Sequence, residues 1–282
     1  MLRARMLFGI GFIAVLLAVV VVDYYVNEPY WGWLALCLML GALAAHELAS
    51  LLGRSHPGAH RGLLYAAVPG LVVVHWVPYF SASSAPLDRW VLLLGGLVVL
   101  GYVLYVAGVV EFASRGGTLR GTAATALAVL YLAGGASAVA SIRWLQSGLF
   151  ALLYFLTTTK SADSGAYVVG SLFGRTPLAR SISPKKTVEG AAGGVLVAVA
   201  VGALFGLFSD RAVLGLAESM ILAGVLGCWG QVGDLFESCL KREAGVKDSS
   251  SWMAGLGGVL DMLDSVIWNG PLFVLWWQIR HL

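Results

Sequence analysis

Charged side chains are scarce in this sequence, and their scarcity excludes a soluble protein. They make up 12% of the 282 residues, against about 25% in a typical soluble domain. Hydrophobic residues make up 59%, and the mean hydropathy is +0.84. The net charge of +3 is small and scattered, so no basic face for a nucleic acid is expected. The composition indicates a membrane protein surrounded by the lipid bilayer.

Cysteine is also scarce. Cys37, Cys228 and Cys239 match no metal-site spacing and provide no disulfide framework. Cys37 and Cys228 lie within apolar runs, which predicts small buried core residues. Glycine, in contrast, is abundant, and its 36 residues are spread through the apolar segments. That distribution is typical of helices that pack closely in lipid.

Nine apolar stretches are long enough to span a bilayer, which takes about 20 helical residues. The first has no small-residue cleavage site after it, so we expect a helix rather than a signal peptide. We predict an all-α, polytopic integral membrane protein with about nine transmembrane helices. Residues 1–145 would form a scaffold with surfaces for lipid or dimer contacts, and residues 146–282 the catalytic region. The stretches are 6–26, 31–52, 61–82, 89–112, 121–142, 147–173, 188–208, 212–240 and 258–279.

The basic residues predict the orientation of these helices. If the N-terminus is cytoplasmic, 13 of the 18 lysines and arginines lie in inside segments and 4 in outside segments, with Lys160 inside a span. An excess of lysine and arginine on the cytoplasmic side is the usual pattern of membrane proteins. We therefore expect the N-terminus to face the cytoplasm.

The charged residues also concentrate in the second half of the chain, where several interrupt apolar stretches. Asp163 stands inside a predicted span, and ionisable groups at that depth usually mark a function. Further on, Ser183-Pro-Lys-Lys-Thr187 places two ammonium groups and two hydroxyls just before a helix, which suits a polyphosphate. The alternatives are a basic loop that only fixes topology, and a simple pair between Asp163 and Lys160 three residues earlier.

A second polar stretch begins at Asp234. On a helix, Asp234, Ser238 and Lys241 would share one face, and this combination suits a complex of a metal with phosphate. The alternative is a solvated loop with a Glu237–Lys241 pair.

The same stretch continues into the last apolar segment, where Gly257 and Gly258 would open a helix. Asp261 and Asp264 then enter that segment, which a solvated loop does not explain. Free backbone N–H groups there could hold phosphate, and carboxylates from two helices could hold a divalent ion.

These motifs resemble the CDP-diacylglycerol synthase family, also called phosphatidate cytidylyltransferase. Its signature reads Ser-x-x-Lys-Arg-x-x-x-x-Lys-Asp and then Pro-Gly-His-Gly-Gly-x-x-Asp-Arg-x-Asp. Residues 162–167, 173–174 and 183–190 are also similar to the family. Three positions depart from it, because Ala254, Leu256 and Met262 replace the usual proline, histidine and arginine. They leave open a divergent substrate preference or weakened activity. The matching residues are Ser238, Lys241, Arg242, Lys247, Asp248, Gly255, Gly257, Gly258, Asp261 and Asp264.

The resemblance implies an enzyme that converts CTP and phosphatidate into CDP-diacylglycerol and pyrophosphate. Its active site would face the cytoplasm from a bacterial cytoplasmic membrane, and a homodimer is left open. Asp234 and Asp261 would bind a divalent ion, Mg²⁺, and Lys241 and Asp264 would complete the catalytic set. The implied substrate-binding residues are Asp163, Ser183, Lys185, Lys186, Thr187, Ser238, Arg242, Lys247, Asp248, Gly257 and Gly258.

Two other functions remain as alternatives. A CTP-dependent polyprenol kinase would keep a cytoplasmic nucleotide site but needs a base to activate an alcohol. A non-enzymatic transporter would use Asp163 and Lys160 as a substrate or proton path. A CDP-alcohol phosphotransferase is disfavoured, since Asp261-x-x-Asp264 lacks the longer aspartate pattern of that family.

Overall fold

The computed structural model describes residues 30–77 apart from 57, 119–250 and 257–281, with scattered helical positions at 14–25 and 101–109. The described chain is almost entirely helical, as expected. Its elements are α2 (Trp31–Ser55), α3 (Arg61–Trp76), α5 (Leu119–Val129), the π-helix η2 (Leu130–Gly134), α6 (Gly135–Ser141), the 3₁₀-helix η3 (Ile142–Trp144), α7 (Gly148–Phe173), β1 (Pro177–Ala179), β2 (Ser183–Thr187), α8 (Val188–Phe208), α9 (Leu216–Glu243) and α10 (Val259–Arg280).

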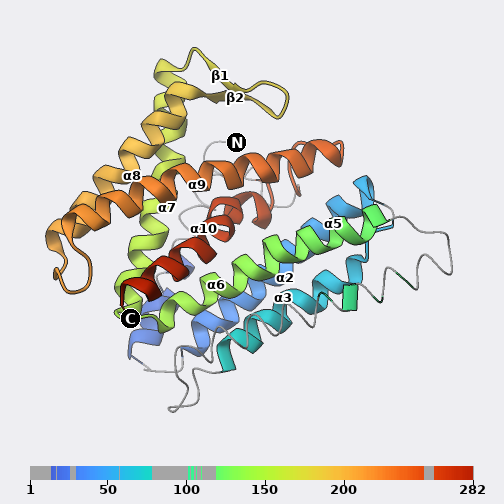
Figure 1. Ribbon diagram of the computed structural model, residues 1–282, viewed down its shortest axis with the longest axis horizontal. Helices are drawn as coiled ribbons and strands as arrows, with labels where there is room; N and C mark the ends of the chain where they lie inside the picture. The colour runs from blue at the N-terminus through green and yellow to red at the C-terminus, as the bar shows by residue number, and fades with distance from the viewer. Residues whose placement is uncertain are drawn as a thin grey trace. The chain divides into compact units, whose positions relative to one another are not determined.

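The first of two compact units comprises residues 1–141 and 243–262. Helices α2, α3, α5 and α6 lie along one another in this unit (Figure 1). Leu48 of α2 and Leu64 and Val68 of α3 are buried in this unit, as is Leu132 of η2. The Trp33 indole donates a 2.9 Å hydrogen bond to a backbone carbonyl of α6, so this part of the bundle has both apolar and polar contacts between helices.

The second unit comprises residues 142–242 and 263–282. It contains α7, the two strands, α8, α9 and most of α10. An aromatic cluster fills its core, in which the Phe155 and Phe273 rings lie 4.9 Å apart. The buried Tyr154 hydroxyl donates to the Ser219 carbonyl at 2.6 Å, which joins α7 to α9.

Helices α7 and α8 approach closely because α8 carries glycines where it crosses α7 (Figure 1). A Cβ atom at Gly194 would lie 2.6 Å from the Ala162 carbonyl oxygen. At Gly190 it would lie 2.9 Å from the Gly170 Cα atom. The glycine-rich pattern predicted close helix packing, and the structure confirms it for this pair.

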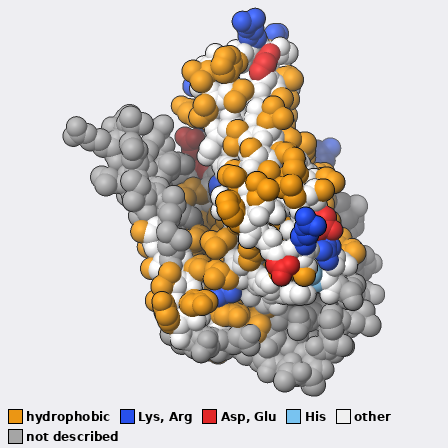
Figure 2. Space-filling model, turned by 90° about the vertical axis from the view of Figure 1, so that its left-hand side faces the viewer, with side chains coloured by type: hydrophobic (Ala, Val, Ile, Leu, Met, Phe, Trp, Pro, Cys, Tyr) orange, Lys and Arg blue, Asp and Glu red, His pale blue; other side chains and the backbone are white. Residues whose placement is uncertain are grey.

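Five of the described helical segments are long and apolar enough to cross a membrane: 31–55, 120–144, 188–208, 216–243 and 259–280. Helices occupy the predicted stretches that begin near 31, 61, 121, 147, 188, 212 and 258. The stretch 89–112 lies mostly outside the described residues, and 6–26 is described only in part. Figure 2 shows many apolar side chains on the described surface of that face, as expected for helices in contact with lipid tails.

Two details differ from the sequence-based expectation. The basic loop contains a short antiparallel hairpin, with Pro177 opposite Thr187 and Ala179 opposite Ser183. Such short strands give no alternating pattern to recognise. Cys37 is buried as expected, but Cys228 is exposed, because the apolar side of α9 at this point is part of the outer surface. In lipid, an apolar residue can face outward as readily as inward.

Candidate functional site

Three carboxylates from two helices converge in the second unit. One oxygen from each of Asp234 and Glu237 on α9 and Asp264 on α10 lies within 4.8 Å of the others. Glu237 and Asp264 are buried and Asp234 is half-buried. Three like charges this close repel one another strongly where little water screens them, so neighbouring cationic groups stabilise the arrangement.

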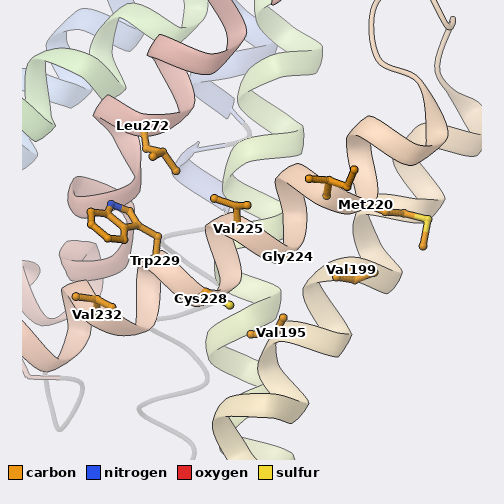
Figure 3. Close-up of a pocket in the computed structure, with 10 residues that line it drawn as sticks. Val195, Val199, Met220, Gly224, Val225, Cys228, Trp229, Val232 and Leu272 are labelled. Carbon is orange, nitrogen blue, oxygen red and sulfur yellow. The ribbon is translucent and has the colours of Figure 1, made fainter.

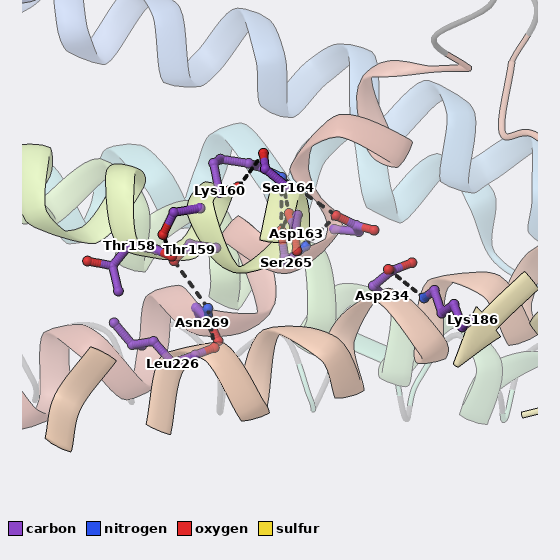
Figure 4. A network of polar contacts seen from close by, with 12 residues as sticks. Thr158, Thr159, Lys160, Asp163, Ser164, Lys186, Leu226, Asp234, Ser265 and Asn269 are labelled. Carbon is purple, nitrogen blue, oxygen red and sulfur yellow. Dashed lines mark hydrogen bonds and ion pairs between the residues drawn. The ribbon is translucent and has the colours of Figure 1, made fainter. Parts of the chain in front are cut away.

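Each of these carboxylates lies beside a lysine, and the three lysines belong to three different elements. Lys186 of β2 forms an ion pair with Asp234, as Figure 4 shows. Lys241 of α9 pairs with Glu237, whose side chain is fully buried. The pair proposed for a solvated loop therefore exists, but in a buried position. Lys160 of α7 places its Nζ atom 3.9 Å from an Asp264 oxygen.

Lys160 and Asp163 also contact Ser265, in the second turn of α10. Lys160 Nζ lies 3.0 Å from Asp163 Oδ2 and 2.9 Å from Ser265 Oγ. The Ser265 hydroxyl donates to Asp163 Oδ2 at 2.8 Å (Figure 4). The Lys160–Asp163 pair is thus present, within a network that also includes Ser265. Lys160 was not among the site residues predicted from the sequence, although a lysine inside an apolar helix is itself a signal of function.

A pocket of about 490 Å³ lies beside these groups, between α7, the hairpin, α8 and α9. Its size is typical of small-molecule sites. Gln231 and Tyr167 also line it, and neither was expected from the sequence; Gln231 donates to the Ala191 carbonyl at 2.9 Å. The predicted site residues on its wall are Asp163, Lys185, Lys186, Thr187 and Asp234.

Other predicted substrate-binding residues hold the hairpin that forms part of this wall. Thr187 is the N-cap of α8, and its hydroxyl accepts from the Gly190 N–H. Arg242, at the end of α9, donates from Nε to the Ile182 carbonyl at 3.1 Å. Ser183 begins β2. These contacts fix the position of Lys185, which is exposed, and of the half-buried Lys186.

The first turn of α10 holds the other motif aspartate. Gly257 has a left-handed backbone with φ of 87°, which favours glycine. Asp261 Oδ2 accepts from the Gly258 N–H at 2.7 Å and from the N–H and hydroxyl of Ser249 at 2.9 and 2.8 Å. The Gly258 N–H, which was predicted to hold phosphate, thus binds a side chain of the protein.

The predicted Asp234–Asp261 metal pair spans the two compact units and stays a prediction. Within the second unit, the structure groups Asp234 with Glu237 and Asp264. Ser238 is buried one turn beyond Asp234, and Lys247 and Asp248 are exposed. Of the three departures from the family signature, Met262 lies on α10, whereas Ala254 and Leu256 lie outside the described residues.

Apolar helices that can cross a membrane, with carboxylates and lysines beside a pocket, define an integral membrane protein whose site is suited to phosphate chemistry. The sequence model of the cytidylyltransferase family matches residues 3–279, and the chain belongs to this family.

Similar proteins come from bacteria and plants. The chain is 43% identical to phosphatidate cytidylyltransferase of Haemophilus influenzae over 129 residues, which cover 45% of each protein. It is 40% identical to the Aquifex aeolicus protein of that name over 134 residues, 48% of this chain and 49% of the relative. It is 45% identical to phosphatidate cytidylyltransferase 5, chloroplastic, of Arabidopsis thaliana over 126 residues, 44% of this chain and 31% of the relative. The chain thus spans about half the length of the bacterial relatives it matches.

Proposed function

We propose that this protein transfers the cytidylyl group of CTP to phosphatidate, giving CDP-diacylglycerol and pyrophosphate. The observation that carries the proposal is the group of three carboxylates, each beside a lysine, next to a pocket in a member of the cytidylyltransferase family. The names of the relatives support the choice of substrates.

The reaction needs electrostatic stabilisation more than a base. A phosphate monoester has a second pKa of about 6, so the phosphatidate phosphate is already an anionic nucleophile at neutral pH. Its oxygen forms a bond to the α-phosphorus of CTP, and the bond from that phosphorus to the bridging oxygen of the β-phosphate breaks. The barrier is repulsion between two polyanions and the charge that develops on pyrophosphate, which fixed cations lower.

Magnesium is the proposed cofactor. Carboxylate oxygens are the ligands that Mg²⁺ prefers, and the spacing of Asp234, Glu237 and Asp264 fits such an ion; Asp261 is retained as a predicted ligand. When bound, the ion would neutralise phosphate charge and stabilise the leaving group. Lys186 already offsets the charge of Asp234.

The lysines around the pocket are assigned to the nucleotide. Lys185 and Lys186 line it together with Asp234, so a triphosphate in the pocket would meet two ammonium groups on one wall. Lys160 has a different role, because it lies between Asp163 and Asp264 and holds both in place.

The lipid substrate is proposed to reach the site sideways from the bilayer. An open apolar groove of about 530 Å³ runs between α8, α9 and α10 and is lined by Val195, Val225, Trp229 and Leu272, among others (Figure 3). Val232 lines this groove, whereas the preceding residue, Gln231, lines the pocket that contains Lys186 and Asp234. An acyl chain in the groove would leave its headgroup free to approach α9.

The arrangement in the membrane is also proposed. Nine spanning helices would place the N-terminus and the active site at the cytoplasmic side of the bacterial cytoplasmic membrane, where CTP is available. The N-terminal helices would supply lipid contacts or the interface of a homodimer.

Labelled CTP tests the proposed reaction directly. Purified protein is incubated with Mg²⁺, with either phosphatidate or a polyprenol, and with CTP carrying radioactive phosphorus at either the α or the γ position. Cytidylyl transfer moves the α label into lipid and releases the γ label as pyrophosphate. A kinase acting on polyprenol would move the γ label into lipid instead. If neither label enters lipid, the enzyme proposal fails and a transporter gains support.

A further inference from the structure

Glu47 is a buried carboxylate in the apolar helix α2, far in sequence from the motifs of the site, and is 3% exposed. Its Oε1 atom accepts from the Val259 N–H at 3.0 Å and its Oε2 atom from the Leu260 N–H at 2.9 Å. These donors belong to the first turn of α10, where backbone N–H groups have no partner within the helix. A negative charge at this end is also favoured by the helix dipole. Glu47 therefore caps the helix that carries the motif aspartates.

One hydroxyl lies between this carboxylate and that of Asp261, and its single proton can be donated to either of them. Ser249 Oγ lies 2.8 Å from Glu47 Oε2 and 2.8 Å from Asp261 Oδ2. The Ser249 N–H donates to Asp261 as well. Glu47 thus contacts the backbone just before Asp261. It also contacts Ser249, which in turn contacts the Asp261 side chain.

Gly258 leaves room for this arrangement. A Cβ atom at this position would collide with the Glu47 carboxylate and with the Ser249 hydroxyl. The motif glycine is therefore needed where the α2 carboxylate reaches the backbone of α10, in addition to any contact with substrate.

We propose that Glu47 is a positioning residue for the reaction: it fixes the first turn of α10 and, through Ser249, the carboxylate of Asp261. This inference rests on the proposed function, because it takes Asp261 to be part of the catalytic set. A catalytic group must be held in one geometry for full activity, and a small displacement costs much of the rate. Asp261 is held by backbone and serine donors that Glu47 keeps in place.

The test variant is Glu47→Gln, which keeps the size of the side chain but removes its charge. The kcat is expected to fall roughly 10- to 100-fold, as when outer partners of a metal site are lost, while the KM for CTP stays nearly constant. In a chain that already carries Asp261→Asn, the same change should add less than about a twofold loss, because the two residues act as one unit. Losses that multiply in the double variant would show that Glu47 acts independently and would overturn the proposal.

Asp23→Asn is the matched control. Asp23 is another buried carboxylate of the first unit, and it accepts from the Gly32 and Trp33 N–H groups at 3.1 and 2.7 Å. Its loss removes a helix-capping charge without touching Ser249 or Asp261. Correctly folded Asp23→Asn protein should keep its kcat; a loss equal to that of Glu47→Gln would mean that any missing cap lowers the rate, against the proposal.

A readout that needs no turnover is hydrogen exchange of the peptide 257–265. Glu47→Gln should speed exchange of the Val259 and Leu260 amides about tenfold or more, since they lose a charged acceptor, and Asp23→Asn should not. If wild-type protein makes no CDP-diacylglycerol, the proposed function is refuted by the activity measurement. Hydrogen exchange still reports, independently of activity, whether Glu47 holds α10. Unchanged exchange in Glu47→Gln contradicts the inference.

Ser249→Ala covers the case in which Glu47→Gln does not fold. It removes the hydroxyl between the two carboxylates and leaves the cap intact. A lower kcat with unchanged exchange at the Val259 and Leu260 amides is expected, and wild-type turnover in this variant would overturn the proposal.

Discussion

Asp234 lies on α9 less than one turn before Glu237, and both carboxylates point into the group that also contains Asp264. The ion pair with Lys186 compensates its charge, so Asp234 is not an unpaired buried charge, which would be costly. In the proposed reaction, Lys186 would turn to the phosphates of CTP and leave the carboxylate available for a cation.

The first prediction concerns the motif carboxylates. Asp234→Asn and Asp261→Asn keep the shape of the side chain but remove its charge, so a folded and inserted protein should lose roughly a thousandfold in turnover. Turnover is measured with labelled CTP at saturating Mg²⁺. The control is Asp248→Asn, at an exposed position, where the loss should be much smaller. Near wild-type turnover in either of the first two variants would refute the metal role of that residue.

The second prediction compares two adjacent lysines that differ in burial. Lys186→Gln should raise the KM for CTP about tenfold, because it removes a charge-assisted contact at a half-buried position. Lys185→Gln removes an exposed charge and should raise it only about twofold. The double variant should affect the KM for CTP more than that for phosphatidate. If the loop only fixes topology, all three variants keep wild-type kinetic constants once they are correctly inserted.

At the scale of elements, the crossing of α7 and α8 forms part of the pocket wall. It brings Asp163 of α7 and Lys186, just before α8, to the wall of one pocket. Glu189 in the first turn of α8 also accepts from the Arg175 and Thr176 N–H groups. The segment that follows α7 is thereby hydrogen-bonded to the start of α8. The pocket therefore depends on how closely these helices approach.

The third prediction tests that approach. Gly194→Ala places a Cβ atom 2.6 Å from the Ala162 carbonyl oxygen, so the helices must separate, at a cost of about 1–3 kcal/mol in stability. We expect a lower melting temperature in detergent and faster loss of activity on heating. Gly70→Ala is the control, because its Cβ would meet nothing within 4 Å and alanine is the better helix residue. Equal melting temperatures for the two variants would show that the crossing tolerates a methyl group.

At the scale of the whole molecule, orientation decides whether CTP can reach the site. The fourth prediction uses a cysteine-free variant in which single cysteines replace the exposed residues Asp248 and Arg211. In intact cells, an impermeant thiol reagent should label Arg211→Cys, predicted to be outside, and not Asp248→Cys, predicted to be cytoplasmic. Opening the cells should make Asp248→Cys reactive. The opposite pattern would reverse the topology and place the pocket on the side that lacks CTP.

The sequence by itself determined the membrane class, the family and most helix positions. Apolar length and composition decide these features, and they do not require knowledge of neighbours in space. Helical spacing likewise placed Asp234, Ser238 and Lys241 on one face, because residues four and then three positions apart share a helix face. Asp264 was indicated by the resemblance to the family signature.

Only the tertiary structure decided which residues meet from different elements. It placed Lys160 beside Asp264, made Glu237 a buried member of the carboxylate group, and gave Thr187 and Arg242 the task of holding a hairpin. It also brought Glu47 to the first turn of α10, across more than 200 positions of sequence. Contacts of this kind depend on how helices pack, and in a membrane the apolar pattern does not reveal which side of a helix faces protein and which faces lipid.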